Sequence, residues 1–128
     1  MTMIGAGLAA CQIDGANLAP MPDYVTQAVY DEAVAHFIAQ RCPSVGQVKQ
    51  TRATNYVAVY NKMQTDGHTR EDFERWRRNF PEAELEKRAS DYFVSRGVTS
   101  MSDPGICRVG LEEIAANSMI GRHLRVEE

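Results

Sequence analysis

The sequence has no long apolar run and no excess of basic residues. None of its 128 residues belongs to a stretch of eighteen or more consecutive apolar residues, so no membrane-spanning helix is predicted. The formal net charge is −3, whereas a dedicated nucleic-acid surface usually carries a basic excess, so no nucleic acid is expected as a partner. Apolar residues make up 44% of the chain and charged residues 24%, a balance typical of one globular domain rather than a disordered chain.

Signatures of catalysis and of cofactor binding are scarce. The nine glycines form no phosphate-binding loop after a strand, and no cysteines and histidines lie at the close spacing of a zinc site. The histidines fall on separate predicted elements, and we interpret all three as surface or boundary residues: His36, His68 and His123. We therefore predict no catalytic residue, no metal ligand and no cofactor, and a protein that is not an enzyme.

The charged clusters are interpreted as solvated helix faces. Two groups of acidic residues could supply carboxylates, but neighbouring acids on a helix point apart: Glu112 and Glu113, and Glu82, Glu84 and Glu86. The basic run Arg75-Trp76-Arg77-Arg78 is surrounded by acidic residues that weaken its field. Its tryptophan lies at helical spacing from Phe73 and Phe80, and we expect Trp76 in the core.

Three cysteines are present, and two of them stand at the ends of predicted helices. Cys42 precedes Pro43 at the end of the first helix, and Cys107 lies near the start of the last. A long-range crosslink can form there without distorting a helix interior, so we predict a disulfide between Cys42 and Cys107. Such a bond indicates an oxidising compartment, which is the periplasm or the cell envelope. Three free thiols in a cytoplasmic protein are the alternative.

The first 22 residues are predicted to form a signal-like or linker segment, followed by a helical domain over 23–126. The segment begins with small apolar residues, and Leu8-Ala9-Ala10-Cys11 resembles the sequence that is cleaved and lipidated in bacterial lipoproteins. Cys11 is thus a candidate lipidation site, through which the protein would be anchored to a membrane. The alternative is a tail rich in glycine and alanine with an unpaired thiol.

Apolar periodicity predicts an all-α, single-domain bundle of about five helices joined by short turns. The first helix is expected over 23–41 and the second over 44–65, with Ser44 as its cap. The third begins at the capping sequence 69–72 and ends near 79. The fourth begins at Pro81 and ends before Gly97, and the fifth spans 104–124. The second helix is expected to bury one apolar face: Val45, Val48, Tyr56, Val59, Tyr60 and Met63.

Two glycines lie inside the predicted last helix, Gly110 and Gly121. Each costs roughly 1 kcal/mol of helix stability relative to alanine. We interpret them as points where another helix approaches closely, from within the domain or, less favoured, from a partner.

Three strings in this order resemble a family of small exported bacterial proteins known only as a domain of unknown function. They are Arg41-Cys42-Pro43-Ser44, then Cys107-Arg108-Val109-Gly110 with Glu113-Ile114-Ala115, then 118–125 (Ser-Met-Ile-Gly-Arg-His-Leu-Arg), and the resemblance covers about 23–125. It implies an exported helical domain in which Cys42 is paired with Cys107. The family is also loosely associated with gene clusters of the respiratory NADH dehydrogenase, which implies an accessory role at a membrane complex.

Three functions remain open from the sequence. The first is a non-enzymatic envelope protein that contacts another protein, with an apolar surface patch as its expected mark. The second is a small enzyme or redox protein that uses Cys107 or a His/Glu pair, and it predicts a pocket with titratable groups of shifted pKa. The third is an inhibitor or immunity-type binding protein.

Overall fold

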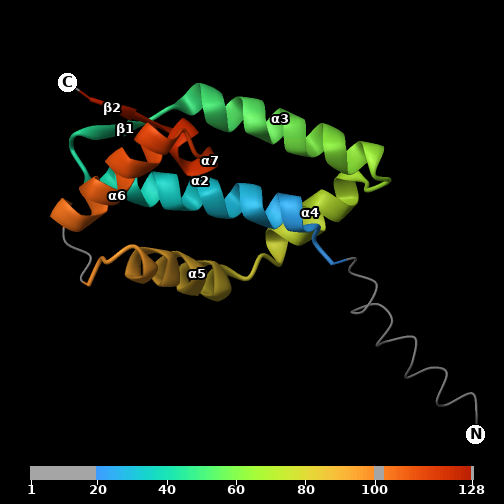
Figure 1. The fold of residues 1–128 in the computed structure, drawn as a ribbon. Helices are drawn as coiled ribbons and strands as arrows, with labels where there is room; N and C mark the ends of the chain where they lie inside the picture. Colours follow the sequence, from blue (N-terminus) through green and yellow to red (C-terminus); the bar gives the residue numbers. More distant parts are fainter. Residues whose placement is uncertain (1–19, 100–102, 128) are drawn as a thin grey trace, which may run out of the picture.

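The computed structural model describes residues 20–99 and 103–127. Helices predominate in these ranges, and the all-α class is confirmed (Figure 1). In chain order the elements are α2 (Asp23–Arg41), β1 (Val45–Gln47), α3 (Lys49–Thr65), α4 (Arg70–Arg78), α5 (Glu82–Ser95), α6 (Asp103–Ala116), α7 (Met119–Arg122) and β2 (Leu124–Val126).

Helix α2 is the central element of the domain. Figure 1 shows α3 along one side of it and α5 along the other, with α6 and α7 over its C-terminal half and α4 connecting α3 to α5. The core gathers around the buried side chains of α2, including Val34, Ala35 and Ile38. The helix ends where predicted, because Cys42 is extended (φ −118°, ψ 106°) before Pro43.

A smaller second core joins α2, α3 and α4. Val25, Met63 and Trp76 are its buried members, which confirms that Trp76 is a core residue. Helix α4 starts as predicted, since the Thr69 hydroxyl accepts from the Asp72 amide (3.0 Å) and the Asp72 carboxylate accepts from the Thr69 amide (2.9 Å).

The predicted second helix is wrong at its beginning. Residues 45–47 form a strand, and α3 begins at Lys49 after Val48 rather than after Ser44. The strand β1 pairs antiparallel with β2, with Gly46 opposite Arg125. This pairing keeps residues 45–47 extended, although the sequence pattern by itself predicts a helix there. Met63 is the buried residue of α3, so the expected apolar face of this helix is largely not in the core.

The predicted last helix is wrong in its second half. Helix α6 ends at Ala116 because Asn117 is left-handed (φ 51°), and the Ser118 hydroxyl accepts from the Gly121 amide (2.9 Å) to cap the short α7. The chain then enters β2. Among the described residues there are thus six helices and a two-stranded sheet instead of five helices.

Helices α2 and α6 are joined covalently and packed closely. Cys42 and Cys107 form the predicted disulfide across 65 residues of sequence, with Cα atoms 5.2 Å apart. A Cβ atom at Gly110 would lie 2.7 Å from Cγ2 of Ile38, which confirms a close helix approach within the domain at this glycine. Gly121 likewise packs against the backbone of Glu113.

Candidate functional site

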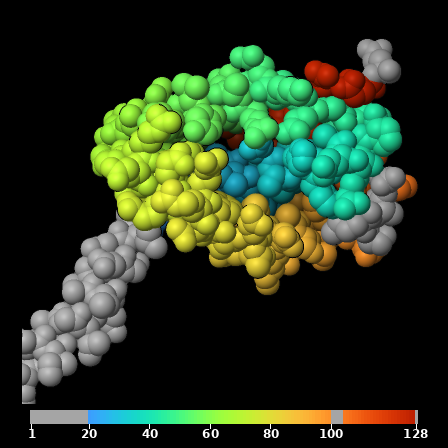
Figure 2. All heavy atoms as spheres, turned by 180° about the vertical axis from the view of Figure 1, so that it is seen from behind, coloured from blue at the N-terminus to red at the C-terminus, as the bar shows by residue number. Residues whose placement is uncertain are grey.

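A largely apolar groove of about 510 Å³ lies between α2, α3, α4 and α5. We call it the four-helix groove. Figure 2 shows it as a hollow in which α2 (blue) is visible between α3 (green) above and α4 and α5 (yellow) below. A concave, mainly apolar site of this size is typical of a binding pocket.

Each helix contributes residues one turn apart to the groove. Helices α2, α3 and α4 each supply residues at positions i, i+3, i+4 and i+7, and α5 supplies residues at i, i+3 and i+4. The last residue of the α4 set, Phe80, follows the end of that helix. This spacing marks one face of a helix, the face that ordinarily packs on a neighbouring helix. The four sets are Val25, Ala28, Val29 and Glu32; Arg52, Asn55, Tyr56 and Val59; Phe73, Trp76, Arg77 and Phe80; Glu82, Leu85 and Glu86.

The groove stays open because α3 is fixed to the rest of the domain near its two ends. Near its start the Thr51 hydroxyl donates to the carbonyl of Arg122 (2.8 Å), and near its end Met63 enters the second core. Between these points Tyr56 is 55% exposed and packs its ring against Tyr60 and Phe73 rather than against α2. The middle of α3 therefore forms a wall of the groove.

One end of the groove is polar. Asn55 and His123 contact each other there through Nδ2 and Nε2 at 3.2 Å, and Arg52 forms an ion pair with Glu32 (2.5 Å). His123 is only 1% exposed, and its Nδ1 has no hydrogen-bond partner among the described residues. Burial lowers the pKa of His123, although the carboxylates of Glu32 and Asp31 oppose the shift. This imidazole is neutral at pH 7.

The charges on the rim of the groove are unevenly distributed. Arg52 is paired with Glu32, and Arg77 is paired with Glu74 (3.3 Å). Glu82 and Glu86, exposed on the α5 rim and one turn apart, have side chains without a partner among residues 20–99 and 103–127. The α5 rim is therefore negative.

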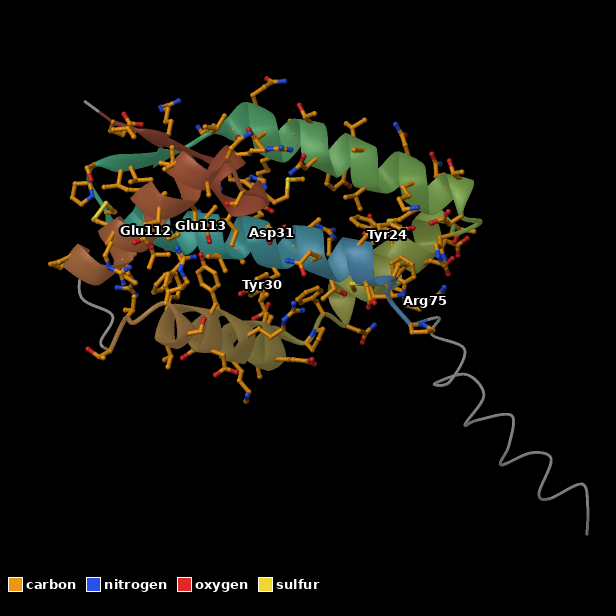
Figure 3. The ribbon with its side chains drawn as sticks, viewed as in Figure 1. Tyr24, Tyr30, Asp31, Arg75, Glu112 and Glu113 are labelled. Carbon is orange, nitrogen blue, oxygen red and sulfur yellow. A yellow bond between two sulfur atoms is a disulfide. The ribbon has the colours of Figure 1, made fainter. Side chains whose placement is uncertain are left out.

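A second polar cluster connects α5 to α6 away from the groove. The Tyr92 hydroxyl donates to the Glu113 carboxylate, and Arg96 donates to Glu113 (2.7 Å) and to Glu112 (2.8 Å). Figure 3 shows both glutamates on α6 and Tyr30 extending from α2 toward α5, where its ring meets that of Tyr92 edge-on. Burial and the hydrogen bond to Glu113 raise the pKa of Tyr92. Every member has a partner, so the cluster holds two helices together.

The structure distributes the residues singled out by the sequence among different places. Cys42 and Cys107 form the disulfide outside the groove, and Cys11 lies outside the described residues. His36 is exposed beside Gln47, and His68 packs edge-on against Trp76, as expected of surface and boundary residues.

Two interpretations of single residues were wrong. His123 is buried because the turn between α7 and β2 places it beneath Asn55, and Glu113 is 8% exposed because Tyr92 and Arg96 cover it. Glu82, Glu84 and Glu86 are exposed as predicted.

The groove offers an apolar surface with polar groups at one end. Among the described residues, no group of three histidine, cysteine or acidic side chains is placed to hold a metal ion, and no helix is long and apolar enough to cross a membrane. The chemistry of the groove supports binding of an apolar surface that is oriented by the charges of the rim.

Comparison with known proteins gives one match. No curated protein and no solved structure matches the chain. The model of a family of unknown function, DUF5333, matches residues 18–125, which include all the helices and most of the small sheet described above. The chain belongs to the family of unknown function DUF5333.

Proposed function

We propose that this protein is an exported, non-enzymatic domain that binds another protein through the four-helix groove. The observation that carries the proposal is the groove itself, into which four helices direct faces of the kind that usually pack against a further helix. Apolar surface of this extent, rimmed by charge, is typical of an interaction site.

Export is supported by the disulfide. A bond between Cys42 and Cys107 persists in an oxidising compartment and is rarely kept in a reducing cytoplasm. Alkylation of the thiols in intact native cells, before and after reduction, tests this point. We expect Cys42 and Cys107 to be labelled only after reduction, and labelling of both without reductant would contradict export.

The resemblance noted above suggests where the partner is to be sought. Its association with respiratory gene clusters makes a membrane respiratory complex the first candidate, to which the domain would be an accessory. An inhibitor or immunity-type role would use the groove in the same manner on a different protein.

One observation favours a second candidate, a small enzyme with a His/Glu pair. His123 and Glu32 both line the groove, and the pKa of His123 is lowered. However, His123 is 1% exposed and Glu32 is paired with Arg52, so neither is positioned as a free acid or base. The version that relies on Cys107 as a redox thiol is disfavoured because Cys107 is bonded to the buried Cys42.

Site-specific photo-crosslinking in the native host tests the proposed function. A benzoylphenylalanine replaces Tyr56 at the mouth of the groove, and the control replaces Val94, which is 63% exposed on α5 and does not line the groove. We expect one discrete protein adduct at Tyr56 that is missing at Val94. Identical adducts from both positions, or none from Tyr56, would contradict the proposal.

A further inference from the structure

We infer that the occupant of the four-helix groove is an amphipathic helix of a partner protein, with apolar residues at i, i+3 or i+4 and i+7 and with lysine or arginine along one flank. This inference rests on the proposed function and specifies the partner surface. It is drawn from the spacing of the lining residues and from the charge of the rim.

The spacing of the lining residues favours a helix. Ridges of side chains one turn apart leave grooves that the ridges of another helix fill. Ala28 lies in the middle of the α2 stripe between Val25 and Val29, and its small side chain allows a helix to approach the floor. A helix with its side chains is about 10–12 Å across. It would therefore lie along the mouth and insert its apolar side chains, which is the helix-in-groove mode of recognition.

The charge of the rim defines the flanks of that helix. Glu82 and Glu86 stand one turn apart on the α5 side without a partner among the described residues, whereas Arg52 and Arg77 are each neutralised by a glutamate. Basic residues one turn apart on the partner helix would meet the two free carboxylates. The same carboxylates would repel an acidic flank, so they select the partner as well as attract it.

The mouth of the groove argues against a lipid chain as the occupant. A site for an acyl chain encloses its ligand, while this groove is open to solvent and bordered by exposed charged residues along α5. At its polar end Asn55 and His123 are already in contact with each other.

A set of three synthetic helical peptides tests the inference with the oxidised full chain. The peptides are crosslinked to preset the helix, share one leucine face, and differ only in carrying lysine, glutamine or glutamate along one flank. Binding is followed by the backbone amide NMR signals of the ¹⁵N-labelled protein. We expect shifts around Val29, Tyr56 and Phe80, and about tenfold tighter binding of the lysine peptide than of the glutamate peptide, since two rim carboxylates contribute.

Matched variants separate the rim from the total charge. In Glu82→Gln/Glu86→Gln the preference for the lysine peptide should fall to within about twofold, because the attracting carboxylates are gone. Glu71→Gln/Glu84→Gln changes the net charge equally at exposed positions outside the groove and should keep the preference.

Three results would overturn the inference: no shift of groove residues with any peptide, equal affinities for the three peptides, or shifts with decyl maltoside where the peptides give none. The last would indicate a site for amphiphiles. If the position-specific adduct at Tyr56 is found but the peptides fail, the proposed function stands and the helical, basic partner is wrong.

Discussion

Removal of the disulfide between Cys42 and Cys107 is expected to cost a large share of the stability of this domain. The bond closes a loop across 65 residues, and the loss of loop-closure entropy in the unfolded chain is worth about 4 kcal/mol. Small domains have total stabilities of roughly 5–15 kcal/mol, so this loss is between about a quarter and about four-fifths of the total.

The assay is urea unfolding of the oxidised protein, of the protein reduced with dithiothreitol, and of Cys42→Ala/Cys107→Ala. With a denaturant dependence of about 1.5 kcal/mol per molar urea, the midpoint should fall by about 2.7 M on reduction. The double variant should fall slightly further, because Cys42 is 1% exposed and its sulfur leaves a small void in the core. A reduced protein with the same midpoint as the oxidised one would refute the reasoning.

Three further perturbations test separate parts of the structure. Gly110→Val should lower the free energy of unfolding, measured in urea, by about 2 kcal/mol, because a side chain at Gly110 collides with Ile38. The control Gly105→Ala, whose Cβ would lie 3.5 Å from Val98, should not destabilise the domain. An unchanged stability of Gly110→Val would show that α2 and α6 are not packed this closely. Tyr92→Phe should cost about 1–2 kcal/mol and raise the pKa of Glu113, which burial would raise but hydrogen bonds from Ser118, Tyr92 and Arg96 lower. Tyr24→Phe breaks a solvent-exposed hydrogen bond of 2.8 Å to Asp66 and should cost less, so equal losses in the two variants would contradict the buried cluster. Because burial lowers the pKa of His123, the unfolded chain binds a proton at this residue before the folded chain does as the pH falls below 6.5. The free energy of unfolding should therefore decrease as the pH falls below 6.5, and His123→Gln should flatten this dependence. An unchanged pH profile in the variant would show that His123 is not buried in its neutral form.

The helices with local start and stop signals could be predicted from the sequence. Pro43 ends α2, the Thr69–Asp72 capping box begins α4, and Gly97, left-handed at φ 84°, follows α5. Each signal acts within one turn of backbone and needs no tertiary contact.

The strands could not be predicted in this manner. β1 and β2 are three residues long and exist through their pairing with each other, although β1 follows the first helix and β2 lies at the end of the domain. The break between α6 and α7 did leave a readable signal, since Asn117 followed by Ser118 is a left-handed residue followed by a helix cap. That break turns the chain and buries His123, so missing it also led to the wrong interpretation of this histidine.

The groove was only partly visible in the sequence. Tyr56 and Val59 were recognised as part of an apolar face of the second predicted helix, but that face was assigned to the core. Whether a helix face packs in the core or borders the groove depends on the distance between α3 and α2. Contacts near the two ends of α3 set that distance. Those contacts join residues distant in sequence and leave no periodic pattern.

The central claim is that the partner protein binds in the four-helix groove. It is tested most directly by calorimetry of the protein that crosslinks at Tyr56, which measures its affinity for the purified wild-type domain, for Ala28→Trp and for Ala53→Trp. Ala28→Trp fills the floor of the groove with an indole, whereas Ala53 is exposed outside the groove. We predict that affinity falls by about tenfold or more in Ala28→Trp and stays unchanged in Ala53→Trp, since a blocked pocket loses its anchoring side chains. A folded Ala28→Trp variant with wild-type affinity would contradict the assignment of function to the groove.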